Sequence, residues 1–167
     1  MEQVKKYELT EETKEFCGHK LFRIRALISF KFVAKGELGG FVESEKNVSH
    51  DGDAWVAGNA WVFGDAWVFG DARVYGDARV YGDARVYGNA RVSGDAKIEI
   101  SADYFVAGPI GSRQSFITFT KSNMSATTGC FYGTIAKFTA AVKKTHGGNE
   151  HAKNYLVLVK MVKAMWK

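Results

Sequence analysis

The stretch "FGDARVYGDARVYGDARVYGNARVSGDAK", residues 69–97, returns to Val-x-Gly-Asp/Asn-Ala every six residues. The same period begins at Asp53 and continues to Ile100, so eight hexads follow one another without interruption. A fixed period this short indicates a solenoid, in which each unit buries its apolar face against its neighbours.

The positions within each hexad predict which side chains form the core. Residues two apart on a strand share a face, so the Ala and Val of each hexad point inward and the residue between them points outward. Gly and Asp or Asn follow at a corner, because both tolerate the backbone conformations of a sharp bend. The expected core columns run from Ala54 to Ala96 and from Val56 to Ile98.

This pattern resembles the hexapeptide-repeat family, in which an aliphatic residue is followed four positions later by a small one. The resemblance implies a left-handed parallel β-helix with three hexads in each triangular coil, and chains that associate as homotrimers. We therefore expect a mainly β protein with a hexapeptide-repeat β-helix over residues 36–102.

With three hexads in each coil, aromatic and arginine side chains stack in outward ladders. One interpretation is that these ladders pack between the chains of an oligomer or grip a host protein, as an inhibitor or assembly element would. The other is a docking surface for a base or a phosphate. Each Arg has an acidic residue two positions earlier, such as Asp71 before Arg73, so the repeats alone are expected to bind anions poorly. The ladder residues are Trp55, Trp61, Trp67, Arg73, Arg79, Arg85, Tyr75, Tyr81 and Tyr87.

Both ends of a solenoid need caps over their unpaired strand edges. Residues 1–35 predict a β-hairpin that turns at Cys17-Gly18-His19 and covers the first coil with Leu21, Ile24 and Leu27.

Residues 103–167 predict a second cap of two or three strands followed by two helices, a ββαα-type α+β module. Thr134 is a good N-cap for a helix over 135–145, and Asn149 for the helix after it. The segments "GPIGSR", "GCFYGT" and "KKTHGGNEHAKNY" look like uncharacterised hexapeptide-repeat proteins of bacteriophages and their Gram-positive hosts. That resemblance covers the whole chain and implies a phage-type accessory protein, without naming a reaction.

Charge indicates where a partner would bind. Of the net charge of +5, residues 101–167 carry nine basic and two acidic side chains, which favours an anionic ligand there. The glycine-flanked loop "GPIGSR" brings backbone N–H groups and a guanidinium together; alternatively, Arg113 pairs with Asp103 or Glu150. We predict that this segment binds an anionic small molecule, foremost a nucleotide. For a phage-type protein, the ligand would be a nucleotide immune signal that the protein sequesters as an anti-defence sponge. The predicted ligand-binding residues are Gly111, Ser112, Arg113, Lys121, Lys143, Lys144 and His146.

Enzymatic alternatives have weaker support. Acyltransferases of the hexapeptide-repeat class use a catalytic histidine, and His50 is the only histidine near a coil. Cys130 with His146 as base is conceivable, but no third orienting group is evident, and a buried strand cysteine is the simpler interpretation. We therefore expect no catalytic residue, metal or cofactor. The sequence shows neither a signal peptide nor a membrane span, which favours the cytoplasm.

Overall fold

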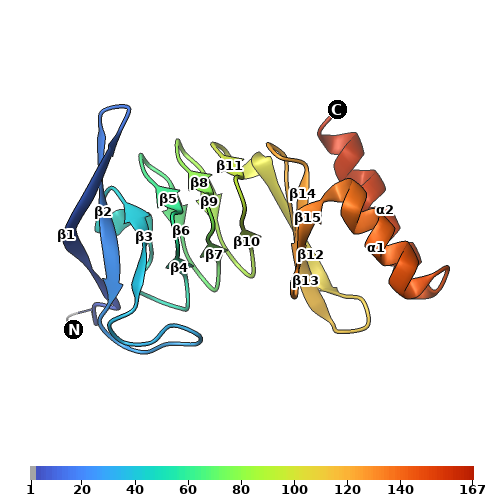
Figure 1. Ribbon diagram of the computed structural model, residues 1–167, viewed down its shortest axis with the longest axis horizontal. Helices are drawn as coiled ribbons and strands as arrows, with labels where there is room; N and C mark the ends of the chain where they lie inside the picture. The colour runs from blue at the N-terminus through green and yellow to red at the C-terminus, as the bar shows by residue number, and fades with distance from the viewer. Residues whose placement is uncertain (1–2) are drawn as a thin grey trace.

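The computed structural model describes residues 3–167 and shows three parts in a row (Figure 1). A blue antiparallel hairpin lies at one end and the green coils lie in the middle. An antiparallel sheet with two helices on its outer face closes the other end. The molecule is therefore a short parallel β-solenoid with a non-repeating module at each end.

Each hexad contributes a two-residue strand to one of three parallel faces of the solenoid. The faces are built from β4-β7-β10, β5-β8-β11 and β6-β9. Arg73 is in register with Trp55 on one side and with Arg91 on the other, as three hexads per coil require. The strands are β4 (Trp55–Val56), β5 (Trp61–Val62), β6 (Trp67–Val68), β7 (Arg73–Val74), β8 (Arg79–Val80), β9 (Arg85–Val86), β10 (Arg91–Val92) and β11 (Lys97–Ile98).

The core of the solenoid consists of the predicted Ala and Val columns. The side chains from Ala54 to Ala96 and from Val56 to Ile98 at these positions are all buried. The corners depend on glycine: Gly76 has φ 72°, and a Cβ there would lie 3.0 Å from the backbone nitrogen of Gly94 in the next coil. All the corner glycines from Gly52 to Gly94 have positive φ, which favours glycine, and at Gly76 the stacked coil also leaves little room for a side chain.

The N-terminal module extends one solenoid face. Strands β1 (Tyr7–Phe16) and β2 (His19–Ala26) form the predicted hairpin. Strand β3 (Leu38–Val42) pairs antiparallel with β2 and parallel with β5, which gives a six-stranded sheet β1-β2-β3-β5-β8-β11. A 3-10 turn, η1 (Glu45–Asn47), follows β3. Leu21 and Ile24 are fully buried and Leu27 is half-buried.

The C-terminal module has more strands than the two or three expected. A second 3-10 turn, η2 (Ser101–Asp103), leads into an antiparallel sheet of β12 (Tyr104–Ile110), β13 (Ser115–Thr120), β14 (Ser125–Thr128) and β15 (Phe131–Thr134). Helices α1 (Ile135–His146) and α2 (Glu150–Met165) follow, and the side chains of Thr134 and Asn149 cap them as predicted. The glycines that suggested strand breaks lie in turns between neighbouring strands or within short strands.

The two faces of this C-terminal sheet differ in chemistry. Ile117 and Phe119 belong to the apolar cluster formed with the helices. The alternate residues Thr118 and Thr127 are buried on the face toward the last coil, where Thr127 Oγ1 lies 2.9 Å from Ser93 Oγ. The sheet therefore meets an apolar layer on one side and the edge of the solenoid backbone on the other. Between residues 3 and 167, neither helix is long and apolar enough to cross a membrane.

Candidate functional site

A cavity of about 240 Å³ lies in the C-terminal module between the β12–β13 turn, the β14–β15 turn and both helices. Its floor is apolar and largely buried, whereas its rim is polar and mostly exposed. We call it the C-terminal pocket. The floor comprises Phe131, Phe138, Ala141, Val142 and Tyr155, and the rim includes Ser112, Arg113, Cys130, Thr145 and His146.

The β12–β13 turn is held tightly against α2. Gly111 has φ 74°, which favours glycine, and a Cβ on it would lie 2.0 Å from the Tyr155 hydroxyl oxygen, so Tyr155 would have to move. The side chain of Gln114 donates a hydrogen bond back to the Gly111 carbonyl at 2.9 Å. This packing sets Ser112 and Arg113 at the pocket rim, although Arg113 is exposed.

The opposite side of the rim is the end of α1. His146 is the last residue of that helix, and its ring centroid lies 6.0 Å from that of Tyr155 and 5.7 Å from that of His151. Burial raises the pKa of Tyr155, and the positive charge of Arg113 opposes that rise. Tyr155 therefore stays a neutral wall residue near neutral pH, beside a cationic rim.

Arg113 is not neutralised by a carboxylate in this arrangement. Among the described residues, the ion pairs within 4.0 Å do not include Arg113, so the alternative pairing with Asp103 or Glu150 is not found. Its guanidinium keeps its hydrogen-bond donors for an anion.

Part of the predicted ligand set lies elsewhere. Lys121 lines a separate depression with Tyr81 and Trp166, at the junction of the solenoid and the C-terminal sheet. Lys143 and Lys144 are exposed on α1 and do not line the C-terminal pocket, because they follow the buried Val142 and project from the other side of the helix. The structure therefore does not bring these three lysines together with Arg113 in the C-terminal pocket.

Sequence reasoning misjudged the environment of Cys130 and did not find Tyr155 as a residue of the pocket. Cys130 is exposed in the β14–β15 turn, so its interpretation as a buried strand cysteine was wrong. Tyr155, in the helix predicted after Asn149, was given no role in a site. The glycines on either side of "CFY" were the available signal for Cys130, since glycine-flanked segments are typical of turns.

His50, the other candidate base, has a structural environment. Its Nδ1 accepts a hydrogen bond from the backbone N–H of Lys6 at 3.1 Å, and its ring stacks on Tyr7 with centroids 4.4 Å apart. Its Nε2 is buried 3.4 Å from a carboxylate oxygen of Glu45. A ring enclosed in this way supports the N-terminal module and has little access to a substrate.

The solenoid surface keeps the predicted stacking but not the predicted ion pairs. Phe69 and Tyr87 stack with centroids 5.3 Å apart, and the Arg79 guanidinium lies 4.5 Å from the Trp61 ring centroid. Within residues 3–167, no repeat Arg forms an ion pair; Asp71 instead contacts Lys31. The pairing that argued against anion binding by the repeats is therefore not found. The described chain also contains no cluster of His, Cys, Asp or Glu suited to a metal ion.

Comparison with known proteins supports the solenoid and nothing more specific. Residues 72–86 and 84–97 match the family model described as YdcK β-solenoid repeat. No curated protein matches the chain at a significant level. The matched residues lie within the regular coils, so the similarity concerns the repeat and does not extend to either end module.

Proposed function

We propose that this protein is a non-enzymatic binding protein that captures an anionic small molecule in the C-terminal pocket. The observation that supports this most directly is the arrangement of Arg113, which lies at the rim of an apolar cavity and forms no ion pair with a carboxylate of residues 3–167. Cavities of this kind typically combine apolar walls with a few polar groups that orient the ligand.

The chemistry of the pocket favours a nucleotide as the ligand class. Phe131 and Tyr155 offer aromatic surface for a base, while Arg113, Ser112 and His146 offer donors for a phosphate. In a phage-type protein, such a pocket would sequester a nucleotide immune signal made by the host and so act as an anti-defence sponge. That biological role rests on the sequence resemblance and on the fold, which by itself does not specify function.

Titration calorimetry with AMP, ADP-ribose and a cyclic dinucleotide tests the proposal. Arg113→Gln removes a charge-assisted hydrogen bond, so binding of the preferred nucleotide should weaken by about 10- to 100-fold. Lys144→Gln is the matched control, because it removes the same charge from the exposed side of α1 and should change affinity by less than about threefold. If none of these nucleotides binds to the parent protein, a nucleotide is excluded as the ligand.

Cys130 and His146 share the pocket rim, which makes a cysteine-dependent reaction the competing hypothesis. The two hypotheses differ in the fate of the ligand. If the protein only binds, the nucleotide is recovered unchanged after prolonged incubation, and Cys130→Ser binds as the parent does. If the parent protein converts the nucleotide and Cys130→Ser does not, the protein is an enzyme and the hypothesis of binding alone is wrong.

A second candidate function concerns the aromatic ladder on the β6-β9 face. Trp67 is 39% exposed and Tyr87 is 52% exposed, and large apolar side chains in a ladder are typical of contact surfaces. We propose that this surface joins copies of the chain, as a homotrimer, with a host protein as the alternative occupant. Light scattering should then give three times the chain mass of 18.5 kDa, whereas a monomeric parent protein would leave the host-protein alternative.

A further inference from the structure

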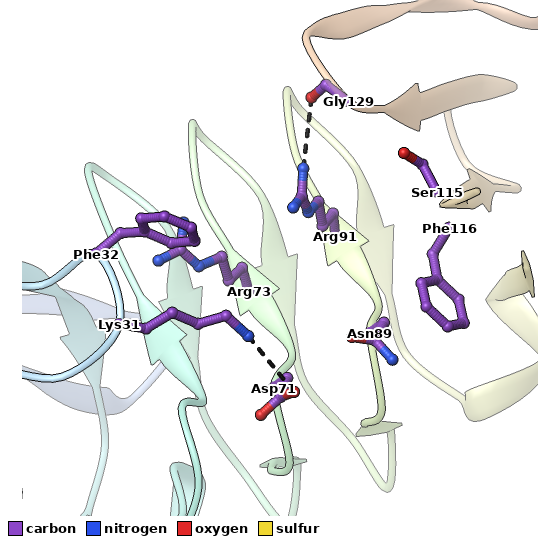
Figure 2. A pocket seen from close by; sticks show the side chains of 9 residues that line it. All are labelled: Lys31, Phe32, Asp71, Arg73, Asn89, Arg91, Ser115, Phe116 and Gly129. Carbon is purple, nitrogen blue, oxygen red and sulfur yellow. Dashed lines mark hydrogen bonds and ion pairs between the residues drawn. The ribbon is translucent and has the colours of Figure 1, made fainter. Parts of the chain in front are cut away.

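A second cationic cavity lies on the solenoid itself, over the β4-β7-β10 face (Figure 2). It has a volume of about 160 Å³, and an adjoining cavity of about 190 Å³ shares Phe32, Arg73 and Arg91 with it. We call the two together the solenoid groove. Together they reach the lower end of the size range of small-molecule sites, which begins at about 300 Å³.

All three parts of the molecule contribute to this groove. Lys31 and Phe32 come from the β2–β3 connection, Arg73 and Arg91 come from adjacent coils, and Phe116 comes from β13. Figure 2 shows these side chains around one opening, with the Arg73 guanidinium turned toward Phe32 and the Arg91 guanidinium turned toward Gly129. The groove is therefore not a repeating property of the hexads; it exists only where both end modules overhang the same face.

The two arginines occupy the same position in adjacent coils, and neither forms an ion pair with a carboxylate of residues 3–167. Arg73 and Arg91 are register partners on neighbouring parallel strands, which are spaced about 4.8 Å apart. The Asp71 carboxylate, two residues from Arg73, lies 3.4 Å from Lys31 Nζ, which is also 3.6 Å from Asp53. Lys31 thus takes up the acidic groups that the sequence places beside the arginines.

Neighbouring groups hold the guanidiniums without neutralising them. The Phe32 ring centroid lies 4.7 Å from the Arg73 guanidinium carbon, and Arg91 donates a long 3.4 Å hydrogen bond to the Gly129 carbonyl. The carboxylate of Glu37, at the edge of the groove, accepts a hydrogen bond from the backbone N–H of Ala34. Burial and the charge of Arg91 lower the pKa of Arg73, against the opposing attraction of Asp53 and Glu37.

We propose that the solenoid groove binds a phosphate monoester that carries an aromatic group, with its phosphate held between Arg73 and Arg91. Two guanidinium forks match the oxygen geometry and double charge of a phosphate, and a bound dianion removes their mutual repulsion. Phe32 is 70% exposed, so much of its surface is open for stacking a base. The proposal is independent of ligand capture at the C-terminal pocket.

The test uses AMP, ribose 5-phosphate and adenosine as probes on Arg113→Gln protein, in which the C-terminal pocket is impaired. AMP should still bind, and Arg73→Gln or Arg91→Gln added to this background should weaken it by about 10- to 100-fold. Arg85→Gln is the matched control, since Arg85 has the same hexad position but its column contains no second Arg. Phe32→Ala should weaken AMP and leave the weaker ribose 5-phosphate unchanged, and adenosine should bind poorly.

Each other outcome identifies what is wrong. The same groove variants are also made singly in the parent protein. AMP binding lost in Arg113→Gln but unchanged in the single variants Arg73→Gln and Arg91→Gln would sink the groove and leave the C-terminal pocket. Binding lost only in the two groove variants would leave the groove and sink the pocket. A fall in oligomer mass in Arg73→Gln, without any change in AMP affinity, would mean that the face contacts a second copy of the chain and not a ligand. Unchanged melting temperatures of the variants show that they remain folded.

Discussion

The first coil of the solenoid leaves backbone carbonyls without a partner in another coil, whereas the last coil leaves backbone N–H groups without one. Within the coils, the N–H of each outward residue donates to the carbonyl of an Ala in the next coil, as from Trp55 to Ala72 at 3.0 Å and from Arg73 to Ala90 at 2.9 Å. At the first coil, Ala carbonyls on its three faces therefore need donors. At the last coil, the N–H groups of outward residues need acceptors.

The two end modules meet these needs with different side chains. The carbonyls of Ala54 and Ala66 accept from Lys6 Nζ at 2.8 Å and Asn47 Nδ2 at 2.9 Å, and that of Ala60 accepts from a β3 backbone N–H. At the other end, N–H groups donate to hydroxyls: Arg85 to Ser101 at 3.1 Å, Arg91 to Thr118 at 2.8 Å and Lys97 to Ser122 at 2.7 Å. The caps are therefore not interchangeable, although the coils between them are nearly identical.

Breaking the carbonyl end at Asn47 should have the largest effect. Its amide donates to Gly64 and Ala66 and accepts from the Ser44 N–H, and the side chain is buried. Asn47→Leu leaves three backbone groups unpaired at about 1–3 kcal/mol each, so chemical denaturation should show a loss of roughly 3 kcal/mol or more. The exposed Asn59 of the repeats, changed to Leu, is the control and should cost less than about 0.5 kcal/mol. Equal losses would show that the amide is not a cap.

The same end should give a distinctive pH dependence through Lys6. Burial lowers the pKa of Lys6 from 10.5 to about 8, against the opposing attraction of Asp53 and Asp51. Between these two values the unfolded chain binds the proton and the folded chain does not, so stability rises with pH. Unfolding measured from pH 7.5 to 9.5 should show a gain of about 2 kcal/mol that Lys6→Met lacks. A parent protein with the same pH profile as Lys6→Met would mean that Lys6 titrates normally.

The hydroxyl end is tested by Thr118→Val, which keeps the shape of this buried side chain and removes the acceptor of the Arg91 N–H. A buried donor without a partner costs about 1–3 kcal/mol. Thr118→Ser keeps the hydroxyl and should recover most of the loss. Thr13→Val makes the same exchange at an exposed position of β1 and is the control. It should change the free energy of unfolding very little.

These caps also show what the sequence could predict and what it could not. The coils follow from a local rule repeated eight times, and helix caps such as Thr134 follow from a rule within one turn. Lys6 and Asn47 act on carbonyls that lie much further along the chain, and no pattern in the sequence distinguishes them from exposed Lys and Asn. Hydroxyls that cap a coil edge, such as Thr118, likewise resemble ordinary strand residues until the sheet is placed on the last coil.

The candidate binding sites divide in the same way. The loop at Arg113 and the end of α1 at His146 were predictable, because a glycine-rich turn and a helix end are local features that carry donors. Lys121 was not excluded by sequence, since a charge excess over a segment does not say which side chains share a surface. Asp71 and Arg73 share a face as predicted, but the ion pair forms with Lys31, from the β2–β3 connection that precedes the whole solenoid.

The smallest expected effect separates burial from hydrogen bonding at the hydroxyl end. Ser122 accepts from the Lys97 N–H at 2.7 Å, shorter than the 2.8 Å bond at Thr118, yet Ser122 is exposed where Thr118 is buried. In Ser122→Ala, water can reach the freed N–H, so unfolding should require only about 0.5–1 kcal/mol less free energy. If Ser122→Ala costs as much as Thr118→Val, the bond itself stabilises the cap. If it costs much less, the cap stabilises the last coil mainly by covering donors that water cannot reach.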